Sequence, residues 1–144
     1  MEKKKVKAQK GGFVENKEND DKLELSNMMY SVRTVKNCEA EEGVILVGAE
    51  DQNVTKYKFG YGDVQQVNIF KGHSSGIRSI EVNKDCTKML TGCEDHSLRV
   101  WDYKSYKPEA ILSGHRDVVT GGIFLNANTY VTTSWDMTIK MWKV

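Results

Sequence analysis

An internal repeat of about 40 residues constrains the fold of this chain more than any other feature of its sequence. A Gly-His pair, an aspartate and a tryptophan each occur twice, 41 or 42 residues apart. In the two copies they are Gly72-His73 and Gly114-His115, Asp95 and Asp136, and Trp101 and Trp142. A period near 40 with four short strands per unit is typical of a β-propeller blade.

Short apolar runs separated by turn residues fill the chain from about residue 22 onward. The runs are rich in Val, Ile, Thr, Tyr and Trp, which suit half-buried, pleated backbone. Turn signals such as Asn83-Lys84-Asp85 and Asn126-Ala127-Asn128 separate them. The pattern predicts an all-β fold of antiparallel strands. Residues 1–21, with six lysines and five acidic residues, are expected to form a disordered charged tail.

A weaker copy of the repeat lies upstream. Asp51 precedes Asp95 by 44 residues, and Tyr57 precedes Trp101 by the same distance. This copy has Asn27-Met28 where a Gly-His pair would fall, and Val47 where the second copy has a threonine. The sequence therefore predicts two regular blades and one degenerate blade.

These signals together resemble the WD40-repeat family. The resemblance covers residues 72–144 through the two Gly-His pairs, the Trp101-Asp102 dipeptide and two Asp-x-Ser/Thr turns. It implies about three four-stranded antiparallel blades, near residues 28–70, 72–112 and 114–144. A closed propeller has about four to eight blades. The ring is therefore expected to be incomplete unless a partner or a second copy closes it.

Three arrangements would cover the open ends of such a ring. The chain could be part of a larger propeller. It could form a head-to-tail homodimer, in which Leu23–Leu25 of each copy completes the last blade of the other and two copies make a six-bladed ring. It could also be an open half-ring that docks onto the sheet edge of a partner. We favour the first arrangement, and the sequence leaves the other two open.

The resemblance also implies a buried hydrogen-bond chain in each regular blade. Carried over position by position, its members are His73, Thr91, Asp95 and Trp101 in one blade and His115, Thr132, Asp136 and Trp142 in the next. Such a chain is physically sensible, because a buried indole N–H and a turn carboxylate both need partners. These residues are therefore expected to have a structural role.

Catalytic and metal-binding functions are not predicted. Serine, histidine and aspartate recur at the same offsets in both copies, which a repeat explains better than a hydrolase site, and no GxSxG, P-loop or GxGxxG motif occurs. The histidines lie at spacings that suit no zinc site. The three cysteines are 48 and 7 residues apart, which predicts no disulfide framework. We expect no enzyme activity, no metal and no cofactor.

Protein binding is the predicted function, through loops that commonly face partners in the family. The resemblance points to Ser74, Glu94, His96, Arg116, Trp135 and Met137. Trp135 is singled out because its equivalents are Glu50 and Glu94, and a large aromatic in an exposed turn is typical of a binding hot spot. The alternative is that Trp135 packs over the neighbouring blade.

The sequence thus predicts a non-catalytic scaffold within a multiprotein complex. The alternative is a ribonucleoprotein component that uses the lysine-rich tail together with Arg78, Arg99 and Arg116. The 21 basic and 20 acidic residues give a net charge of +1, so binding of nucleic acid through bulk charge is not expected. No apolar run approaches the length of about 18 residues that a membrane-spanning helix needs, and the sequence shows no secretory signal. We therefore predict an intracellular protein that is not associated with a membrane. The cytoplasm is the expected place, and a cytoskeletal, ciliary or nuclear location stays open.

Overall fold

The computed structural model describes residues 13–16, 22–25, 29–34, 43–60 and 63–144. Within these residues the regular elements are all β-strands, and no helix is long and apolar enough to cross a membrane. The strands are β1 (Phe13–Asn16), β2 (Lys22–Leu25), β3 (Met29–Thr34), β4 (Val44–Ala49), β5 (Asn53–Gly60), β6 (Asp63–Lys71), β7 (Ile77–Val82), β8 (Lys88–Cys93), β9 (Ser97–Asp102), β10 (Lys107–Ser113), β11 (Val119–Asn126), β12 (Thr129–Ser134) and β13 (Ile139–Lys143).

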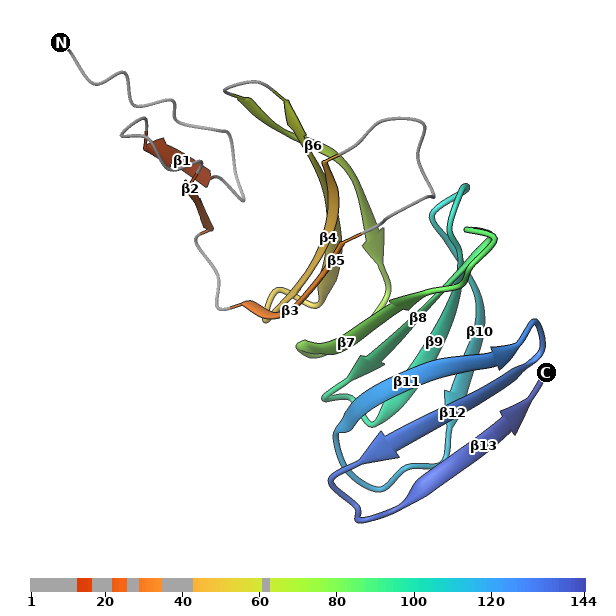
Figure 1. The fold of residues 1–144 in the computed structure, drawn as a ribbon. Helices are drawn as coiled ribbons and strands as arrows, with labels where there is room; N and C mark the ends of the chain where they lie inside the picture. Colours follow the sequence, from red (N-terminus) through yellow and green to blue (C-terminus); the bar gives the residue numbers. More distant parts are fainter. Residues whose placement is uncertain (1–12, 17–21, 26–28, 35–42, 61–62) are drawn as a thin grey trace, which may run out of the picture.

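Three antiparallel sheets follow one another along the chain, and we call them blades 1, 2 and 3. Blade 1 is β3-β4-β5-β6, blade 2 is β7-β8-β9-β10, and blade 3 is β11-β12-β13. The first strands of the blades lie side by side, since β7 contacts both β3 and β11 (Figure 1). The predicted all-β fold with about three antiparallel blades and an unclosed ring is confirmed.

Blade 3 differs from the other two in the number of its strands. Its sheet ends at β13, and no fourth strand pairs with β13 among the described residues. In blade 2 the corresponding strand β9 is covered by β10, with Val100 opposite Ala110 and Leu98 opposite Leu112. The outer edge of β13 is therefore an open sheet edge in the described part of the chain.

A small two-stranded sheet lies before the blades. β1 pairs antiparallel with β2, with Phe13 opposite Leu25 and Asn16 opposite Lys22. β1 lies within residues 1–21, for which the sequence predicts a disordered tail, and the other residues of that range lie outside the described part of the chain. Leu23–Leu25 forms a strand as expected, but it pairs with β1 and not with the edge of blade 3.

The apolar core lies between neighbouring blades. Successive residues of a strand point to opposite faces of its sheet, so Met89 of β8 faces blade 1 and Leu90 faces blade 3. Blade 2 is therefore apolar on both faces. The larger side chains between blades 1 and 2 are Leu46, Val54, Phe70, Ile77, Met89 and Trp101, and those between blades 2 and 3 are Leu90, Leu98, Val100, Val119 and Tyr130.

Two of the cysteines lie in this part of the molecule and behave differently. Cys93 is buried and free, as a small apolar side chain would be. Cys86 is disulfide-bonded, which the prediction of no disulfide framework did not anticipate. Spacing along the sequence does not determine which thiols the fold brings within bonding reach.

Two glycines allow the blades to approach one another closely. Gly48 of β4 and Gly92 of β8 occupy equivalent positions in blades 1 and 2. A Cβ at Gly48 would lie 2.7 Å from Cγ2 of Ile77, and a Cβ at Gly92 would lie 2.8 Å from the carbonyl oxygen of Val119. Ile77 and Val119 begin the first strand of the next blade. Because glycine has no side chain, this strand can pack directly against the glycine backbone.

Replacement of Gly92 by alanine is expected to push blade 3 away from blade 2. The added methyl group would overlap backbone that cannot move alone, so the free energy of unfolding should fall by about 1–3 kcal/mol. Gly122→Ala is the control, because its new methyl group would come closest to the end of the Leu98 side chain, at 3.2 Å, and would meet Thr132 and the Val131 carbonyl only at ordinary contact distances of 3.6 and 3.9 Å. Denaturant unfolding measures both variants, and equal losses would contradict this account of the blade contact.

Candidate functional site

A chain of hydrogen bonds crosses blade 2 from its third strand to the turn before that strand. Nε1 of Trp101 lies 2.7 Å from Oγ1 of Thr91, which lies 2.6 Å from Nε2 of His73. Nδ1 of His73 lies 2.9 Å from Oδ2 of Asp95. An indole N–H only donates and a carboxylate only accepts. Trp101 therefore donates to Thr91, Thr91 donates to Nε2 of His73, and the N–H at Nδ1 of neutral His73 donates a hydrogen bond to Asp95.

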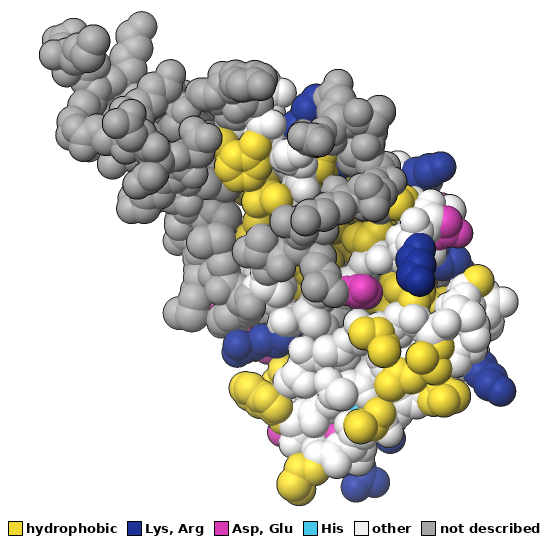
Figure 2. Space-filling view, in the orientation of Figure 1, with side chains coloured by type: hydrophobic (Ala, Val, Ile, Leu, Met, Phe, Trp, Pro, Cys, Tyr) yellow, Lys and Arg dark blue, Asp and Glu magenta, His cyan; other side chains and the backbone are white. Residues whose placement is uncertain are grey.

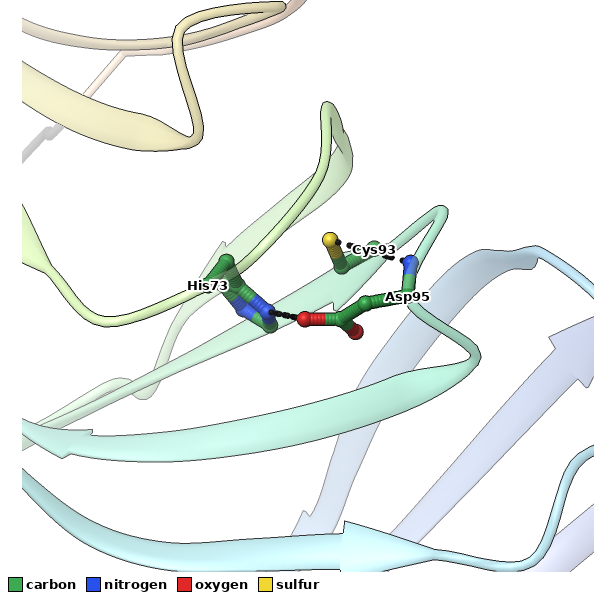
Figure 3. Close-up of side chains that lie close together, drawn as sticks. All are labelled: His73, Cys93 and Asp95. Carbon is green, nitrogen blue, oxygen red and sulfur yellow. Dashed lines mark hydrogen bonds and ion pairs between the residues drawn. The ribbon is translucent and has the colours of Figure 1, made fainter.

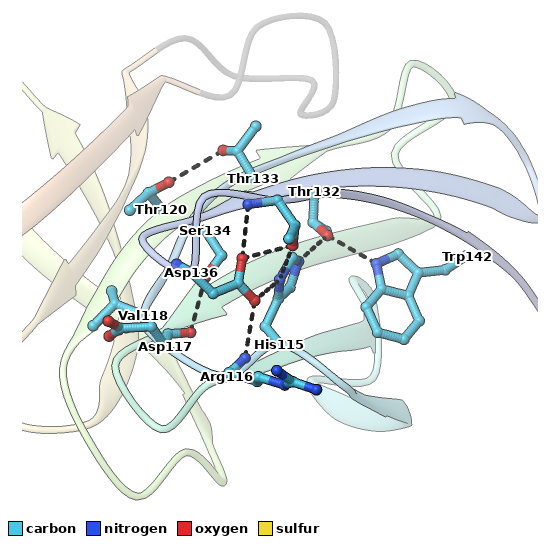
Figure 4. Close-up of polar contacts among 11 residues, drawn as sticks. His115, Arg116, Asp117, Val118, Thr120, Thr132, Thr133, Ser134, Asp136 and Trp142 are labelled. Carbon is cyan, nitrogen blue, oxygen red and sulfur yellow. Dashed lines mark hydrogen bonds and ion pairs between the residues drawn. The ribbon is translucent and has the colours of Figure 1, made fainter.

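Blade 3 repeats this chain with its own residues (Figure 4). Nε1 of Trp142 lies 2.8 Å from Oγ1 of Thr132, which lies 2.7 Å from Nε2 of His115. Nδ1 of His115 lies 2.8 Å from Oδ2 of Asp136. The two sets of four residues that the family resemblance groups together thus lie in hydrogen-bond contact in both blades.

The aspartate at the end of each chain holds two backbone segments together. Oδ2 of Asp95 accepts the N–H of Ser74, and Oδ1 accepts the N–H of Ser97 at 3.0 Å and its hydroxyl at 2.5 Å. Asp136 likewise accepts the N–H groups of Arg116 and Thr138, both at 2.9 Å. Each carboxylate therefore ties the segment before the first strand to the turn between the second and third strands.

Burial and hydrogen bonding set the charges in the network of blade 2. Burial lowers the pKa of His73 and outweighs the hydrogen bond and charge of Asp95, which raise it. Burial alone would raise the pKa of Asp95, but hydrogen bonds from His73 and Ser97 outweigh it and hold that pKa well below its usual range. The pair therefore consists of a neutral imidazole and a carboxylate.

The glycine before each histidine makes room for the tryptophan of the same blade. A Cβ at Gly72 would lie 3.1 Å from Cη2 of Trp101, and a Cβ at Gly114 would lie 3.1 Å from Cη2 of Trp142. The repeated Gly-His pair thus has one physical origin, because the imidazole joins the network while the bare backbone before it rests against the indole ring.

Blade 1 keeps only the turn of this arrangement. Val47 and Tyr57, at the positions of the threonine and the tryptophan, are buried in an apolar cluster with Val64. Oδ1 of Asp51 still accepts the N–H of Asn53, as the aspartates of the other blades accept the N–H two residues on. Apolar packing therefore replaces the hydrogen-bond chain. Asn27-Met28, at the expected Gly-His position, lies outside the described residues.

One group of side chains has the composition of a metal site. The ligand atoms of His73, Cys93 and Asp95 lie within 4.8 Å of one another (Figure 3). Burial raises the pKa of the Cys93 thiol to about 12, which opposes the thiolate that zinc requires.

The same position in blade 3 explains why Cys93 lies there. The thiol of Cys93 donates to the carbonyl of Ser75 and its sulfur accepts the N–H of Asp95, at 3.2 and 3.3 Å. Ser134 makes the equivalent bonds with Asp117 and Asp136, both at 3.1 Å. Because a serine does in blade 3 what the thiol does in blade 2, we assign Cys93 to the turn and not to a metal site.

The turns that the networks hold carry the residues expected to bind partners. Ser74, His96 and Arg116 are exposed, and Met137 is 96% exposed. His96 and Met137 occupy the same turn position as Gln52, with φ values of 65°, 64° and 70°. This left-handed conformation is costly for residues other than glycine. The neighbouring aspartates stabilise it, and it directs the Met137 side chain into solvent.

Arg78 joins the turns of blades 2 and 3, a role that the sequence did not indicate. Its guanidinium forms an ion pair with Glu94, which also accepts the hydroxyl of Ser75 at 3.2 Å. The same guanidinium lies 5.6 Å from the ring centre of Trp135 in blade 3. Glu94 is therefore engaged within the protein. Trp135 contacts Arg78 of the neighbouring blade and still keeps 59% of its surface exposed, and its role as a binding hot spot stays a prediction.

Sequence comparison identifies the class of protein that this geometry represents. The family model described as "WD domain, G-beta repeat" matches residues 64–102, which run from β6 to β9, and residues 106–143, which run from β10 to β13. The chain belongs to the WD40-repeat family.

Its relatives include two insect proteins named "Ribosome biogenesis protein WDR12 homolog". The one from Aedes aegypti is 31% identical over 129 residues, covering 74% of this chain and 30% of the relative. The one from Culex quinquefasciatus is 32% identical over 130 residues, covering 74% and 31%. The chain thus spans about a third of the length of the curated relatives that it matches.

Solved structures share the fold at lower sequence identity. "Structure of U3-55K" and "Crystal structure of RRP9 WD40 repeats" each superpose with a TM-score of 0.71 and 21% identity. The superpositions cover 83% of this chain and 37% and 36% of the two solved chains. At this identity they support the fold alone.

Removal of the Thr132 hydroxyl tests the network of blade 3. Thr132→Val keeps the shape of the side chain but leaves the indole N–H of Trp142 and Nε2 of His115 without partners. The free energy of unfolding should fall by about 1–3 kcal/mol. Thr133→Val, one residue on, changes an exposed side chain and should stay within about 0.5 kcal/mol. Denaturant unfolding compares them, and a smaller loss for Thr132→Val than for Thr133→Val would refute the buried network.

The neutral state of His73 predicts how stability depends on pH. The pKa of this histidine is lower in the fold than in the unfolded chain, where it is about 6.5. Unfolding therefore takes up a proton at acidic pH, and stability should fall as the pH drops below about 6.5. The lowered pKa of Asp95 adds a second loss below about pH 4. Thermal unfolding from pH 8 to pH 3 measures both.

Two variants distinguish the contribution of His73 to this pH dependence from the contributions of other groups. His96→Asn should retain the loss of stability between pH 7 and pH 5, because His96 is exposed. His73→Asn should be less stable at pH 7 and lose part of that pH dependence. An unchanged pH profile in His73→Asn would show that this imidazole is not held neutral.

Proposed function

We propose that this chain is a non-catalytic protein-binding module of a complex that works in ribosome biogenesis. The observation that carries the proposal is the pair of rigid turns joined by Arg78, with Trp135 and Met137 exposed beside it. The shared name of the insect relatives supports the choice of complex.

We propose a non-catalytic role because the histidines and aspartates of the regular blades are already engaged in hydrogen bonds within the protein. The histidine and aspartate of each regular blade are engaged with one another, with a threonine and with backbone N–H groups. A general base needs access to substrate, whereas the side chains of His73 and His115 are almost fully buried. We therefore assign these residues to the stability of the turns.

A preorganised surface favours protein binding. Trp135 supplies a large apolar ring, and its contact with Arg78 limits its motion before any partner arrives. Met137 adds a flexible apolar side chain that adapts to different partner shapes. The networks behind the turns fix the backbone, so less conformational entropy is lost when a partner binds.

Direct binding of RNA is the second candidate, since ribosome biogenesis involves RNA. Of the three arginines that favoured it, Arg78 is paired with Glu94, and Arg99 is half-buried with its Nε enclosed. Arg116 is exposed. The described residues thus offer less free positive charge than the sequence suggested. A protein partner therefore fits this surface better than a phosphate backbone does.

The location that follows from this proposal is the nucleus. The sequence alone favoured the cytoplasm and left the nucleus open, and a role in ribosome biogenesis favours the nuclear alternative. A fluorescent fusion of the protein should therefore accumulate where ribosome precursors assemble. Uniform cytoplasmic fluorescence would count against the proposal.

Sedimentation of the protein from its own cells tests the function. We expect a tagged copy to sediment with particles that contain unprocessed ribosomal RNA. Trp135→Ala combined with Met137→Ala should reduce that fraction at least about fivefold, because the double variant removes a hot-spot residue. Ile111→Ser, which changes an exposed apolar residue of β10, is the control and should sediment as the unmodified protein does.

The same gradients distinguish a protein partner from RNA. Binding through phosphate contacts weakens steeply with salt, by about one unit of logarithmic slope per contact. Association that persists as the salt is raised supports the protein partner, whereas its loss together with a steep salt slope supports RNA. If the tagged copy of this chain does not sediment with these particles even at low salt, the proposed function is wrong.

A further inference from the structure

A cleft lies between blades 2 and 3, at the end of the strands opposite to the turns that the networks hold. The β7–β8 turn forms one side and the β11–β12 turn forms the other, and the cleft has a volume of about 350 Å³. Both sides belong to described residues of adjacent blades, so the cleft does not depend on where the sequence ends. The residues that line it include Asn83, Lys84, Asp85, Phe124, Leu125 and Ala127.

The cleft is separate from the predicted partner-binding turns. β8 runs from the β7–β8 turn to the turn that carries His96, and β12 runs from the β11–β12 turn to the turn that carries Trp135. The two sets of turns therefore lie at opposite ends of the same strands. Figure 2 shows yellow, dark blue and magenta side chains close together where Figure 1 draws the β7–β8 and β11–β12 turns. This end of the molecule thus combines apolar and charged groups.

Turns of different length leave the cleft open. The β7–β8 turn has five residues and the β11–β12 turn has two. The pairing with β12 is irregular between Phe124 and Asn126, so Leu125 is the extra residue of a β-bulge, and it is 54% exposed. A bulge aims its side chain away from the regular face of a sheet. The short turn and the small Ala127 side chain therefore leave space that an apolar group of another molecule can fill.

Hydrogen bonds and ring packing fix both sides of the cleft before any ligand arrives. Oδ1 of Asn83 accepts the N–H of Thr87 at 3.0 Å, and Nδ2 of Asn83 donates to the hydroxyl of Thr87, also at 3.0 Å. On the other side, Phe124 packs edge to face on Tyr130 with ring centres 5.4 Å apart, and the Tyr130 hydroxyl donates to the carbonyl oxygen of Ala127 at 3.4 Å. A preformed cleft costs less conformational entropy when a ligand binds.

The charges beside the cleft favour an acidic ligand. Lys84 lines it, and Lys104 and Lys107 at the β9–β10 turn are exposed at the same end of blade 2. The carboxylates nearby are engaged within their own turns, since Oδ1 of Asp85 accepts a hydroxyl at 2.9 Å and Oδ1 of Asp102 accepts the N–H of Lys104 at 3.0 Å. Lys84 makes no ion pair within the described part of the chain. A carboxylate of a partner therefore meets an unpaired cation at the edge of the cleft.

The apolar lining decides which kind of acidic ligand fits. Phe124, Leu125 and Ala127 form the apolar part of the cleft. A sugar-phosphate backbone would contact the lysines and leave these side chains in water. An extended polypeptide supplies both groups, because an apolar side chain can enter the cleft while carboxylates on either side of it contact the lysines. The volume is at the lower end of small-ligand sites, so it suits one side chain and not a helix.

We propose that this cleft binds an extended acidic segment of a partner protein, which inserts one large apolar side chain between blades 2 and 3. Acidic residues beside that anchor contact Lys84 and the lysines of the β9–β10 turn. The inference goes beyond the proposed function, because it adds a second protein-binding site at the end opposite to Trp135. A module with a site at each end can hold two members of a complex together.

Short synthetic peptides test the proposal on the full 144-residue chain. Each fluorescein-labelled peptide has a leucine, phenylalanine or tryptophan at its centre, glutamates on either side, and glycine and serine at its ends. Fluorescence anisotropy should give a dissociation constant on the order of 100 µM for the preferred anchor, because one side chain and a few ionic contacts must offset the ordering of the peptide. A central glycine should weaken binding at least about tenfold. Lysines in place of the glutamates should weaken it at least about fivefold.

Two pairs of variants locate the binding site. Ala127→Trp should abolish binding, because the indole fills the cleft, whereas Ile111→Trp places the same side chain on β10, outside the lining, and should bind as the unmodified chain does. Lys84→Glu should weaken binding at least about fivefold. Lys71→Glu, the same change at the end of β6, should leave binding unchanged. All four positions are exposed, and thermal unfolding checks that each variant folds.

Equal binding of peptides with and without the apolar anchor, or equal binding by Ala127→Trp and the unmodified chain, would overturn the proposal. So would the absence of binding by every peptide up to about 1 mM. Labelled polyuridine is the RNA probe. If it binds more tightly than every peptide and Ala127→Trp abolishes that binding, the cleft belongs to RNA and the proposal is wrong. These measurements use no ribosome precursor, so their failure leaves the sedimentation test of the proposed function unaffected.

Discussion

The hydrogen bond between a buried histidine and a turn aspartate is the interaction on which the two regular blades depend. His73 and Asp95 connect the tryptophan of the third strand to the turn before it, and the aspartate also binds backbone N–H groups from two segments. A buried imidazole without this partner would be costly. Since each bond in the chain fixes the next donor, the network sets the tautomer of His73, the register of the strands and the shape of the turn together.

Blade 1 shows that this network is one of two ways to hold the same turn. Its turn aspartate keeps the backbone hydrogen bond, while Val47 and Tyr57 fill the positions of the threonine and the tryptophan with apolar volume. Val47 carries no hydroxyl, so the link that a threonine makes between the histidine and the tryptophan is absent at this position of blade 1. The degenerate repeat therefore keeps the turn with apolar packing in place of that link.

The surface on the turns follows from this rigidity. The backbone of Met137 adopts a left-handed conformation that an unsupported turn would avoid, and Asp136 stabilises it through the N–H of Thr138. Arg78 then joins the turns of two blades through Glu94 and Trp135. Side chains that look like separate surface residues in the sequence thus form one preorganised patch, with its strain offset by the networks below.

The sequence by itself determined the periodic part of this protein. The blades, their strands and the members of both networks repeat every 41–44 residues, because each blade needs the same side chains at the same positions. Only the tertiary structure decided what joins different repeats: the contact of Arg78 with Trp135 and the seat that Gly92 provides for β11. These depend on distances between blades, which no spacing within a repeat encodes.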